Sequence, residues 1–562
     1  MKTVRIIFIS LAVLLQAFSM QAEGRLRERV YVSTDRDVYV AGDRVWLSAY
    51  CVDPASGRLS SFSKTAYLEL HSADAMVQTA RVALSGGRGA GVFTLPSTLP
   101  TGNYRLLAYT ALESAEKGFD AGTGSRIISV FNTLSTARAE GGVIVQDDVP
   151  AAAVHPQAGS LAVSVGRSAD GHTPLTVTNG GAQPVLFNLS VRHADAIAAP
   201  QSEDMVGFAS ALSSLPAPSG FDKSVAAEYE GEIIRASVTG ASAEGVKALN
   251  GKNAFLSSPG DGSGVYSSAI HDGRVTFFTS NIYGKQEMFL EIEGVGRDNI
   301  CHLELDSPFL DLPAGEIPAL ALCPSYAPDL ALRGLGMQLE QAFDADTLYS
   351  PLPDSRPVVF DRNRCKSYVL DDYTRFPVME ELFTEFIPEV RVRTVEGSKQ
   401  LQVRTIDLIG NNYFAAGSAL VLLDGVPVLD QRKILGYDPL LVRRIDVYSG
   451  LYFLGIRSFR GVVNFVTYKG TLEGMQFEDN VRIVTFEGCP LPLAYTCEDV
   501  GKDYPDWRQT LYWHPLLKLA PGESVGIDCK SPLYEGDFEV MAEGLTDSGE
   551  PVRTTASFRI SR

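Results

Sequence analysis

The sequence predicts a mainly β protein, built from several tandem β-sandwiches and one small α+β domain. Short apolar segments that alternate with polar residues and end at turn-forming residues recur along most of the chain, which is typical of antiparallel strands. Helical spacing of apolar residues is prominent in two stretches, 330–343 and 378–386. A length of 562 residues indicates several domains rather than one core.

The overall charge restricts the kinds of partner. The sequence carries 67 Asp and Glu against 49 Lys and Arg, a formal charge of −18. Binding to nucleic-acid phosphates or to an anionic membrane surface needs clustered cations, so neither partner is expected. Beyond the N-terminus no apolar run reaches the length of a transmembrane helix, and the mature chain is therefore expected to contain no membrane-spanning segment.

The N-terminus has the composition of a secretory signal peptide. Two basic residues precede the apolar run Ile6–Phe18, and small residues follow it,. We expect cleavage after Ala22, which makes residues 1–22 the signal peptide, with Ser19 as the alternative cleavage point. Export would place the mature chain in the periplasm or at the outer membrane of a Gram-negative cell, and the cell surface stays open as a third location.

Cysteine usage argues against a disulfide-based fold. Seven cysteines are few for this length and odd in number,. None forms a CxxC pair, so neither a zinc knuckle nor a thioredoxin-type redox centre is expected. Cys489 and Cys497 are close enough in sequence to bridge a hairpin, and buried free thiols are the alternative.

Residues 23–134 are predicted to form the first sandwich. The stretch 30–51 contains alternating segments joined by a turn at Gly42, which predicts two antiparallel strands with one buried face. Further alternating segments follow at residues 66–71, 77–84, 90–95 and 104–109. About seven short strands with regular turns are typical of a β-sandwich.

Three motifs in this region resemble the second macroglobulin domain of the α2-macroglobulin family. They are Thr34-Asp35-Arg36 with Tyr39, Gly42-Asp43, and Gly102-Asn103-Tyr104. The resemblance implies a macroglobulin-like sandwich of the Ig-like class. Members of the family form a covalent trap through a thioester in a GCGEQ motif. The segment Glu487-Gly488-Cys489-Pro490 comes nearest to it here but lacks the Gln that would supply the acyl carbon, so no thioester is expected.

The middle of the chain divides into four parts. Residues 135–160 are rich in Ala, Gly and Pro and are interpreted as a linker. Residues 161–224 are predicted to form a second, degenerate β-sandwich, which ends in a loop with a short helix at 194–224. Residues 225–307 are predicted to form a small β-sandwich, of the carboxypeptidase-regulatory-like or macroglobulin-like type. Residues 308–367 are expected to be an irregular, partly helical connector.

Residues 368–475 are predicted to form the α+β domain. Within it, Val421–Gly470 has the order strand, Asp-Gly turn, short helical turn, strand, strand,. This order resembles the plug domain of TonB-dependent outer-membrane receptors, which implies a structural or docking module. The motif residues that carry the resemblance are Asp424, Gly425, Pro427, Gly455, Gly461, Lys469 and Gly470.

Two expectations follow from the plug resemblance. Gly425 is expected in a tight turn between apolar segments, and not in a ligand pocket. Receptors of this family need a barrel of many membrane strands, each of ~9–11 residues, after the plug. The residues that follow Gly470 are too few for such a barrel, so the chain is not expected to be the channel itself.

Residues 476–562 are predicted to form a C-terminal β-sandwich. The segment Tyr504–Pro515 resembles the opening of a terminal domain in secreted bacterial proteins that also carry macroglobulin-type and plug-like domains. Trp46 and Trp513 lie in apolar strand segments and are expected to pack against a sheet. Trp507, the most exposed-looking aromatic, and the adjacent Arg508 are predicted as a partner contact.

No residue pattern indicates catalysis. HExxH and G-x-S-x-G motifs are absent,. The Gly-rich segments 86–91 and 260–264 lie between predicted strands and are interpreted as hairpin turns. The acidic pairs Asp371-Asp372 and Glu380-Glu381 do not have the spacing of a calcium loop,. We therefore expect neither enzyme activity nor a cofactor or metal ion.

The function that remains is binding. We expect a non-enzymatic, extracytoplasmic binding or scaffold protein with protein partners in the Gram-negative envelope, accessory to an outer-membrane uptake or secretion machine. The alternative is a macroglobulin-like protease inhibitor that traps proteases sterically without a thioester. This alternative requires a protease-sensitive bait loop, for which 135–160 and 194–224 are the candidates.

Overall fold

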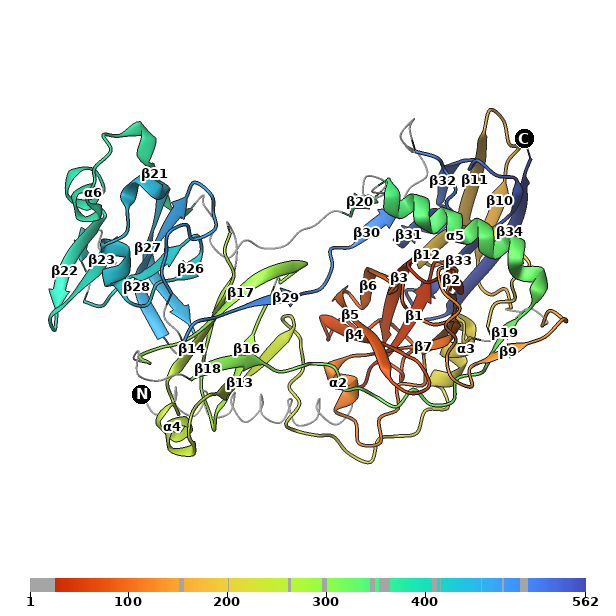
Figure 1. Cartoon of the computed structure of the whole chain (residues 1–562), viewed down its shortest axis with the longest axis horizontal. Helices are drawn as coiled ribbons and strands as arrows, with labels where there is room; N and C mark the ends of the chain where they lie inside the picture. The colour runs from red at the N-terminus through yellow and green to blue at the C-terminus, as the bar shows by residue number, and fades with distance from the viewer. Residues whose placement is uncertain are drawn as a thin grey trace. The chain divides into compact units, whose positions relative to one another are not determined.

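The structure is a computed structural model and confirms the mainly β fold class (Figure 1). The chain divides into two compact units. Unit 1 comprises the chain up to Tyr229, Phe309–Pro353 and Cys489–Arg562, and unit 2 comprises Glu230–Pro308 and Asp354–Gly488. The described residues are 26–150, 156–200, 202–260, 264–280, 282–295, 301–343, 349–352, 364–406, 412–414, 416–455, 457–477, 480–495 and 504–561. The expected signal peptide and Cys497, and with it the proposed Cys489–Cys497 bridge, lie outside these residues.

Unit 1 begins with a sandwich in which the strand order is β1-β3-β6-β5-β4-β7-β8-β2. Its elements are β1 (Arg29–Thr34), β2 (Val38–Val40), β3 (Arg44–Val52), β4 (Thr65–His71), β5 (Met76–Ser85), β6 (Arg88–Thr94), β7 (Gly102–Tyr109), α2 (Ala111–Ser114) and β8 (Arg126–Phe131). The sequence predicted that the segments on either side of Gly42 pair with each other. This is confirmed for β1 and β3, which pair antiparallel, but not for β2, which pairs in parallel with β8 before the chain turns at Gly42 (φ 99°) into β3,.

Strands β1 and β3 of this sandwich are buried on both faces. The alternating pattern predicted one buried face, and that face does carry the aliphatic core, with Val32 and Leu47 among its members. The other face of β1 and β3 carries Tyr31 and Tyr50, which pack against helix α3 (Met205–Leu212). In β1 and β3, alternate side chains therefore face the aliphatic core and the junction with α3. Neither set of side chains faces solvent.

The second sandwich of unit 1 combines distant parts of the sequence. Its two sheets have the orders β10-β11-β32 and β20-β30-β31-β12-β33-β34. The strands are β10 (Leu161–Val165), β11 (His172–Asn179), β12 (Val185–Ala194), β20 (Tyr349–Pro351), β30 (Leu493–Tyr495), β31 (Thr510–Leu519), β32 (Ser524–Lys530), β33 (Gly536–Thr546) and β34 (Pro551–Ile560).

This composite sandwich corrects two predicted boundaries. Residues 161–224 and 476–562 were predicted as separate sandwiches, but β12 pairs with both β31 and β33. One hydrophobic core contains Phe187 from the first part and Val540 from the second. Each part alone has too few strands to cover an apolar face, and a period of two residues does not reveal which strand will be the partner.

Connecting segments of unit 1 are more ordered than predicted. The helix expected at 330–343 is α5 (Ala327–Ala342), which follows the 3-10 turn η1 (Pro324–Tyr326). Within the predicted linker 135–160, β9 (Val143–Val145) pairs in parallel with β19 (Leu320–Leu322).

Unit 2 contains a small sandwich and the α+β domain. The small sandwich consists of β13 (Ile233–Thr239), α4 (Ala243–Ala248), β14 (Asn253–Ser257), β15 (Val265–Ala269), β16 (Arg274–Phe278), β17 (Lys285–Ile292), β18 (His302–Leu305) and β29 (Arg482–Glu487). Its sheets have the orders β16-β13-β18 and β15-β14-β17-β29. β29 was assigned to the C-terminal sandwich from the sequence, but it completes this sheet by pairing with β17.

The α+β domain has the element order that the sequence predicted. Its main sheet has the order β21-β27-β28-β25-β26, and a second sheet has the order β22-β23-β24. The elements are β21 (Lys366–Val369), η4 (Leu370–Asp372), α6 (Met379–Glu385), β22 (Val390–Val395), β23 (Ser398–Ile406), β24 (Asn412–Phe414), β25 (Leu420–Leu423), β26 (Val426–Pro427), α7 (Gln431–Leu435), η5 (Pro439–Leu441), β27 (Val442–Leu454) and β28 (Arg457–Thr467). One aliphatic and aromatic core joins α6, α7 and both sheets.

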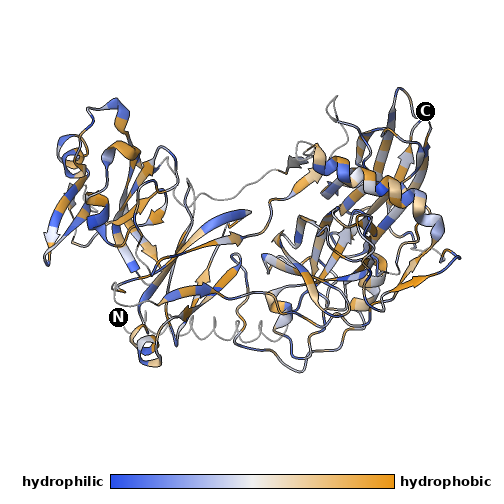
Figure 2. Ribbon diagram, in the orientation of Figure 1, coloured by the Kyte–Doolittle hydropathy of each residue, from blue (hydrophilic) through white to orange (hydrophobic). Residues whose placement is uncertain are grey.

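Hydrophobic residues are prominent on the strands of both units, interleaved with hydrophilic ones (Figure 2). In the part of the chain that the structure describes, no helix is both long enough and apolar enough to cross a membrane.

Candidate functional site

The macroglobulin-like motif at Asp35 joins the two sandwiches of unit 1. Asp35 is fully buried in the connection between β1 and β2. Its carboxylate accepts hydrogen bonds from the Tyr39 hydroxyl (2.8 Å), the Trp46 backbone N–H (3.1 Å) and the Thr510 hydroxyl (2.6 Å). Thr510 lies on β31 of the composite sandwich. Because the buried carboxylate is satisfied by groups from both sandwiches, it acts as a structural junction.

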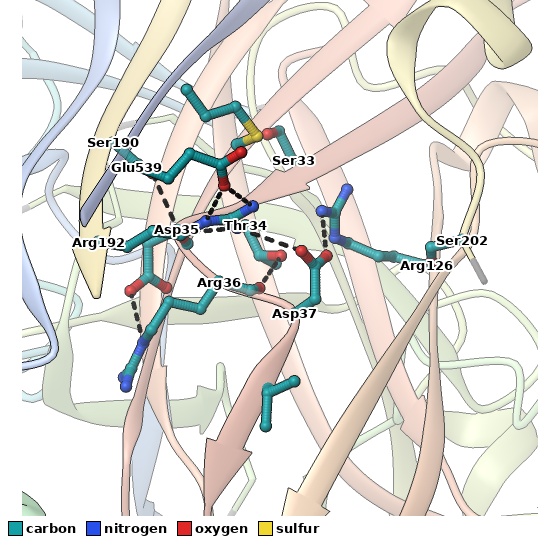
Figure 3. A network of polar contacts seen from close by, with 12 residues as sticks. Ser33, Thr34, Asp35, Arg36, Asp37, Arg126, Ser190, Arg192, Ser202 and Glu539 are labelled. Atoms are coloured by element: carbon teal, nitrogen blue, oxygen red, sulfur yellow. Dashed lines mark hydrogen bonds and ion pairs between the residues drawn. The ribbon is translucent and has the colours of Figure 1, made fainter. Parts of the chain in front are cut away.

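Arginines from both sandwiches extend this junction (Figure 3). Arg192 on β12 donates to Glu539 on β33 at 2.8 Å and to Asp37 at 3.2 Å. Arg126 on β8 donates to the other carboxylate oxygen of Asp37, so Asp37 lies between guanidinium groups of the two sandwiches (Figure 3). Burial lowers the pKa of Arg192, but Asp37 and Glu539 outweigh it and raise that pKa. The junction therefore consists of arginines and carboxylates whose opposite charges neutralise one another inside the protein.

Arg508 is engaged inside unit 1, which contradicts the prediction that it contacts a partner. Its side chain is completely buried and donates to Asp506 at 2.7 and 2.8 Å. The guanidinium also lies over the Tyr495 ring, with 5.4 Å to the centroid. Trp507 is half-buried and stacks on Tyr534, with 5.8 Å between the ring centroids. Arg508 is thus not available to a partner, because its charge is already neutralised inside the protein.

The other two tryptophans pack as predicted. Trp46 and Trp513 are buried in one aromatic cluster, and Trp46 stacks on Tyr495 with 5.5 Å between the ring centroids. Both tryptophans contribute packing at the place where the first sandwich meets the composite one.

Arg88 is a junction residue that sequence reasoning missed. Its guanidinium donates to the carbonyl oxygens of Phe187 (3.0 Å), Pro515 (3.1 Å) and Leu517 (3.2 Å). The register of β31 against β12 shifts at this point, as expected of a bulge at a proline, which has no N–H for the ladder. Burial and the Arg88 cation lower the pKa of the neighbouring His514 to about 4. Nothing near Arg88 in the sequence marks this role, since its acceptors lie on distant strands.

The bait-loop candidate 194–224 is internal at its helix and exposed at most residues of 213–224. Its helix α3 begins at the N-cap Asp204, which accepts a hydrogen bond from the Gly207 N–H at 2.8 Å. Phe208 is buried and its ring centroid lies 5.2 Å from that of Tyr31. A protease could reach the helix only after this junction had opened.

In unit 2, the predicted turn residues Asp424 and Gly425 join β25 to β26. Their φ angles of 47° and 86° are those of a type I′ hairpin turn. The buried Asp424 carboxylate accepts hydrogen bonds from the Thr467 N–H (2.7 Å), the Thr467 hydroxyl (2.7 Å) and the Leu472 N–H (2.8 Å). A hollow of about 230 Å³ beside the turn includes Lys469 in its wall, but the carboxylate itself is engaged by the protein. Asp424 therefore holds the turn onto β28.

Two further motif glycines are required by close packing. Gly461 has φ 97°, and a Cβ atom there would lie 2.4 Å from the Val403 Cβ. Gly455 has φ 56°, and a Cβ atom there would lie 2.4 Å from the Ser267 carbonyl oxygen. Both positions need glycine for its left-handed backbone and its lack of a side chain.

The last three motif residues are also structural. Pro427 lies opposite Leu422 in the β25–β26 pair. The Gly470 N–H donates to the Thr467 hydroxyl at 2.9 Å, and Lys469 forms a surface ion pair with Glu473. None of these contacts indicates a ligand.

Unit 2 contains an open cleft of about 920 Å³. One wall is the end of β17 and the turn after it, and the other wall is β25 with the region around α7. The lining residues are Glu291–Val295, Ser418–Val421, Val428–Lys433, Arg457, Phe459 and Asn480. This volume lies in the range of ligand-binding pockets.

The lining of the cleft is chemically mixed. Arg457 forms an ion pair with Glu293 (3.0 Å), and Arg432 pairs with Asp430 (2.8 Å). Apolar side chains such as Phe459 lie among these pairs. Sequence reasoning missed the cleft, because its walls come from segments far apart in the chain and no motif connects them.

Comparisons with known proteins identify no family for this chain. No family model matches the sequence, and no curated protein matches it at a significant level. The solved structure of Salmonella α2-macroglobulin reacted with methylamine aligns over 95% of this chain and 40% of its own, at 10% identity and a TM-score of 0.24. Trypsin-activated Escherichia coli α2-macroglobulin aligns over 95% and 41%, at 8% identity and a TM-score of 0.24.

The Yersinia pseudotuberculosis adhesin InvE aligns over 50% of this chain and 57% of its own, at 12% identity and a TM-score of 0.13. The present chain thus spans about 40% of the length of the macroglobulins. TM-scores this low do not establish a shared arrangement of domains. The plug resemblance receives no support from these comparisons.

Proposed function

We propose that the chain is an exported, non-enzymatic binding or scaffold protein in which unit 1 is the framework and unit 2 presents the binding surface. The observation that carries this proposal is the open cleft of about 920 Å³ in unit 2. By contrast, the motif residues of unit 1 are engaged in internal hydrogen bonds and ion pairs.

The lining of the cleft suits a protein segment as its occupant. Protein interfaces combine an apolar centre with charged and polar groups at the rim. The half-buried Val295 and Leu429 supply apolar surface in the cleft, and Arg432, with 72% of its side chain exposed, supplies a rim charge. The predicted signal peptide places the partner in the envelope of a Gram-negative cell, and the plug resemblance motivates a partner in an outer-membrane uptake or secretion machine.

The test is affinity purification from the envelope fraction after chemical cross-linking. Ser418→Trp places a large side chain in the cleft, while Ser449→Trp adds the same side chain to an exposed position of β27 outside it. We expect the same envelope proteins to be recovered with the natural chain and with Ser449→Trp, and to be lost with Ser418→Trp. Recovery of the chain alone, or equal recovery with both variants, would contradict the proposal.

The protease-trapping alternative retains a candidate stretch in each predicted segment. Most described residues of 135–150 and most residues of 213–224 are exposed, whereas α3 is packed in the sandwich junction. If the chain traps proteases, brief proteolysis should cut between residues 135 and 150 or between 213 and 224 and leave the bound protease unable to digest large substrates. A protease that cuts there and keeps full activity on large substrates would exclude trapping.

A further inference from the structure

Strand β22 is the edge of its sheet. The sheet has the order β22-β23-β24, and β22 pairs with β23 alone. The turn Glu396-Gly397 has φ angles of 49° and 81°, so β22 and β23 form a hairpin with a two-residue type I′ turn. In Figure 1, β22 forms the outer margin of this sheet.

The hydrogen-bond pattern shows which groups of β22 face outward. The Arg404 N–H donates to the Glu389 carbonyl at 2.7 Å. Residues directly opposite in an antiparallel pair alternate between bonded and non-bonded positions. The backbone N–H and C=O groups of the odd-numbered residues of β22 therefore point toward β23. The corresponding groups of Val392 and Thr394 point to the outer edge. Among the described residues no other strand pairs with this edge.

The solvent-facing side of the hairpin is cationic. Arg391 and Arg393 are exposed and lie opposite Gln402 and Gln400. The Arg391 guanidinium stacks over the Phe414 ring, 4.1 Å from its centroid, and donates to Gln402. These contacts hold Arg391 extended across the sheet.

The hairpin differs from the rest of the chain in charge. Residues 390–406 contain four cationic side chains and one carboxylate, in a chain with a net charge of −18. The carboxylate, Glu396, lies in the turn. The cations Lys399 and Arg404 are engaged, by Glu380 of α6 and by the Pro388 carbonyl. Helix α6 buries Met379, Leu382 and Phe383 in the domain core.

Edge strands that carry charges resist pairing with apolar or like-charged strands. Opposite charges directly across two strands attract each other, and acidic side chains would pair with arginines through two parallel hydrogen bonds. The edge of β22 is thus closed to most strands but complementary to an acidic one.

We propose that the outer edge of β22 binds an extended acidic segment of a partner protein as an additional strand, with an Asp or Glu side chain facing the exposed Arg393. Main-chain hydrogen bonds to Val392 and Thr394 provide the pairing, and Arg393 selects for acidic residues, while Arg391 is held toward β24 by Gln402 and Phe414. This inference rests on the proposed binding function but not on the cleft.

The test measures binding of a fluorescein-labelled nine-residue peptide, with alternating Glu and Val, to the full chain by fluorescence anisotropy. Thr394→Pro removes the outward N–H of an exposed residue, which an edge strand tolerates, and Thr394→Val keeps it. We expect Thr394→Pro and Arg393→Glu each to weaken binding at least tenfold, and Thr394→Val to bind as the natural chain does.

Two control peptides separate strand addition from simple charge attraction. One replaces each Glu by Lys, and the other keeps the Glu residues but replaces alternate Val residues by Pro, so that it cannot form a strand. Equal binding of either control, or an unchanged affinity in Arg393→Glu, would overturn the proposal.

The peptide experiment tests the β22 edge and the envelope experiment tests the cleft, so either proposal can fail without the other. If Thr394→Pro lowers peptide affinity while Ser418→Trp does not reduce envelope partners, the edge is supported and the cleft is not. If the natural chain does not bind the acidic peptide but loses its envelope partners on Ser418→Trp, the reverse holds.

Discussion

The arginines at the proposed recognition surfaces of unit 2 differ from those at the junction of unit 1. In unit 1, Arg192 and Arg508 are largely withdrawn from solvent, and both are paired with carboxylates of the same unit. In unit 2, Arg391 and Arg393 are exposed on an edge strand and Arg432 lies at the rim of a cleft, while Arg444 is buried against Asp446. The comparison teaches that burial, and not the unit to which an arginine belongs, decides whether its charge stabilises the interior or is available for recognition.

The two units can be followed separately in one experiment. Trp46, Trp507 and Trp513 are the three tryptophans of the chain, and all lie in unit 1. Tryptophan fluorescence during urea unfolding therefore reports on unit 1, while far-UV circular dichroism reports on both units. Each prediction below uses this division.

The largest expected effect is the loss of a buried charge pair in unit 1. Arg508→Ala leaves Asp506 buried without its partner, which should lower the stability of unit 1 by about 3–5 kcal/mol. The fluorescence transition should move to lower urea concentration. The matched control is Arg559→Ala, which breaks an exposed pair with Asp537 and should cost less than about 1 kcal/mol. Equal shifts for the two variants would show that burial does not distinguish these pairs.

A comparable test for unit 2 uses Gly461→Ala. The added Cβ would strain a left-handed backbone and collide with Val403, so we expect a loss of about 2–4 kcal/mol. The circular dichroism transition should shift while tryptophan fluorescence stays unchanged. Gly436→Ala, where the nearest atom is 3.5 Å away, serves as the control. A simultaneous shift in fluorescence would mean that the units unfold together.

A smaller effect is expected from the buried carboxyl of Glu113 in unit 1. Burial raises its pKa well above the ordinary value, and Arg29 offsets this only in part, while Glu116 and Glu28 add to it. A raised pKa in the folded state stabilises the fold at acid pH, and that stabilisation is lost as pH rises through the folded pKa. Glu113→Gln should therefore raise the stability of unit 1 by about 1–2 kcal/mol at pH 8 and leave it nearly unchanged at about pH 4, below the pKa of an unfolded glutamate. A gain that is the same at both pH values would contradict the assignment.

The last prediction concerns His514 and the slope with which the stability of unit 1 changes with pH. Burial and Arg88 lower the pKa of His514 to about 4. The unfolded histidine takes up a proton near pH 6.5, and the folded one does so only near pH 4. Stability that is present above pH 6.5 is thus lost as pH falls toward 4. His514→Gln should flatten this part of the fluorescence-monitored stability profile, and an unaltered slope would exclude His514 as its source.

Local features of the fold could be predicted from the sequence. The Asp424-Gly425 turn was expected because few residue pairs accept two left-handed φ angles in succession. Helices α5 and α6 were expected from their apolar spacing and from Pro377 and Pro388 near the ends of α6,. These signals act within a few residues, so a single sequence displays them.

The candidate site could not be predicted in the same way. Trp507 and Arg508 look exposed in a polar segment of sequence, but Tyr534, in the bend before β33, and Tyr495 on β30 pack against them. The cleft has no sequence signature, because its walls belong to separate strands and turns. Burial of a charged side chain depends on what packs above it, which the neighbouring sequence does not state.

The sequence by itself determined where strands and turns lie, since strand period and turn chemistry are local properties. Only the tertiary structure decided which strands pair. β12 pairs with β31 and β33, and β17 pairs with β29, because the backbone N–H and C=O groups along both edges of a buried strand need hydrogen-bond partners,. That requirement turned two predicted sandwiches into one, buried the motif at Asp35 in a junction, and left the cleft and the β22 edge open in unit 2.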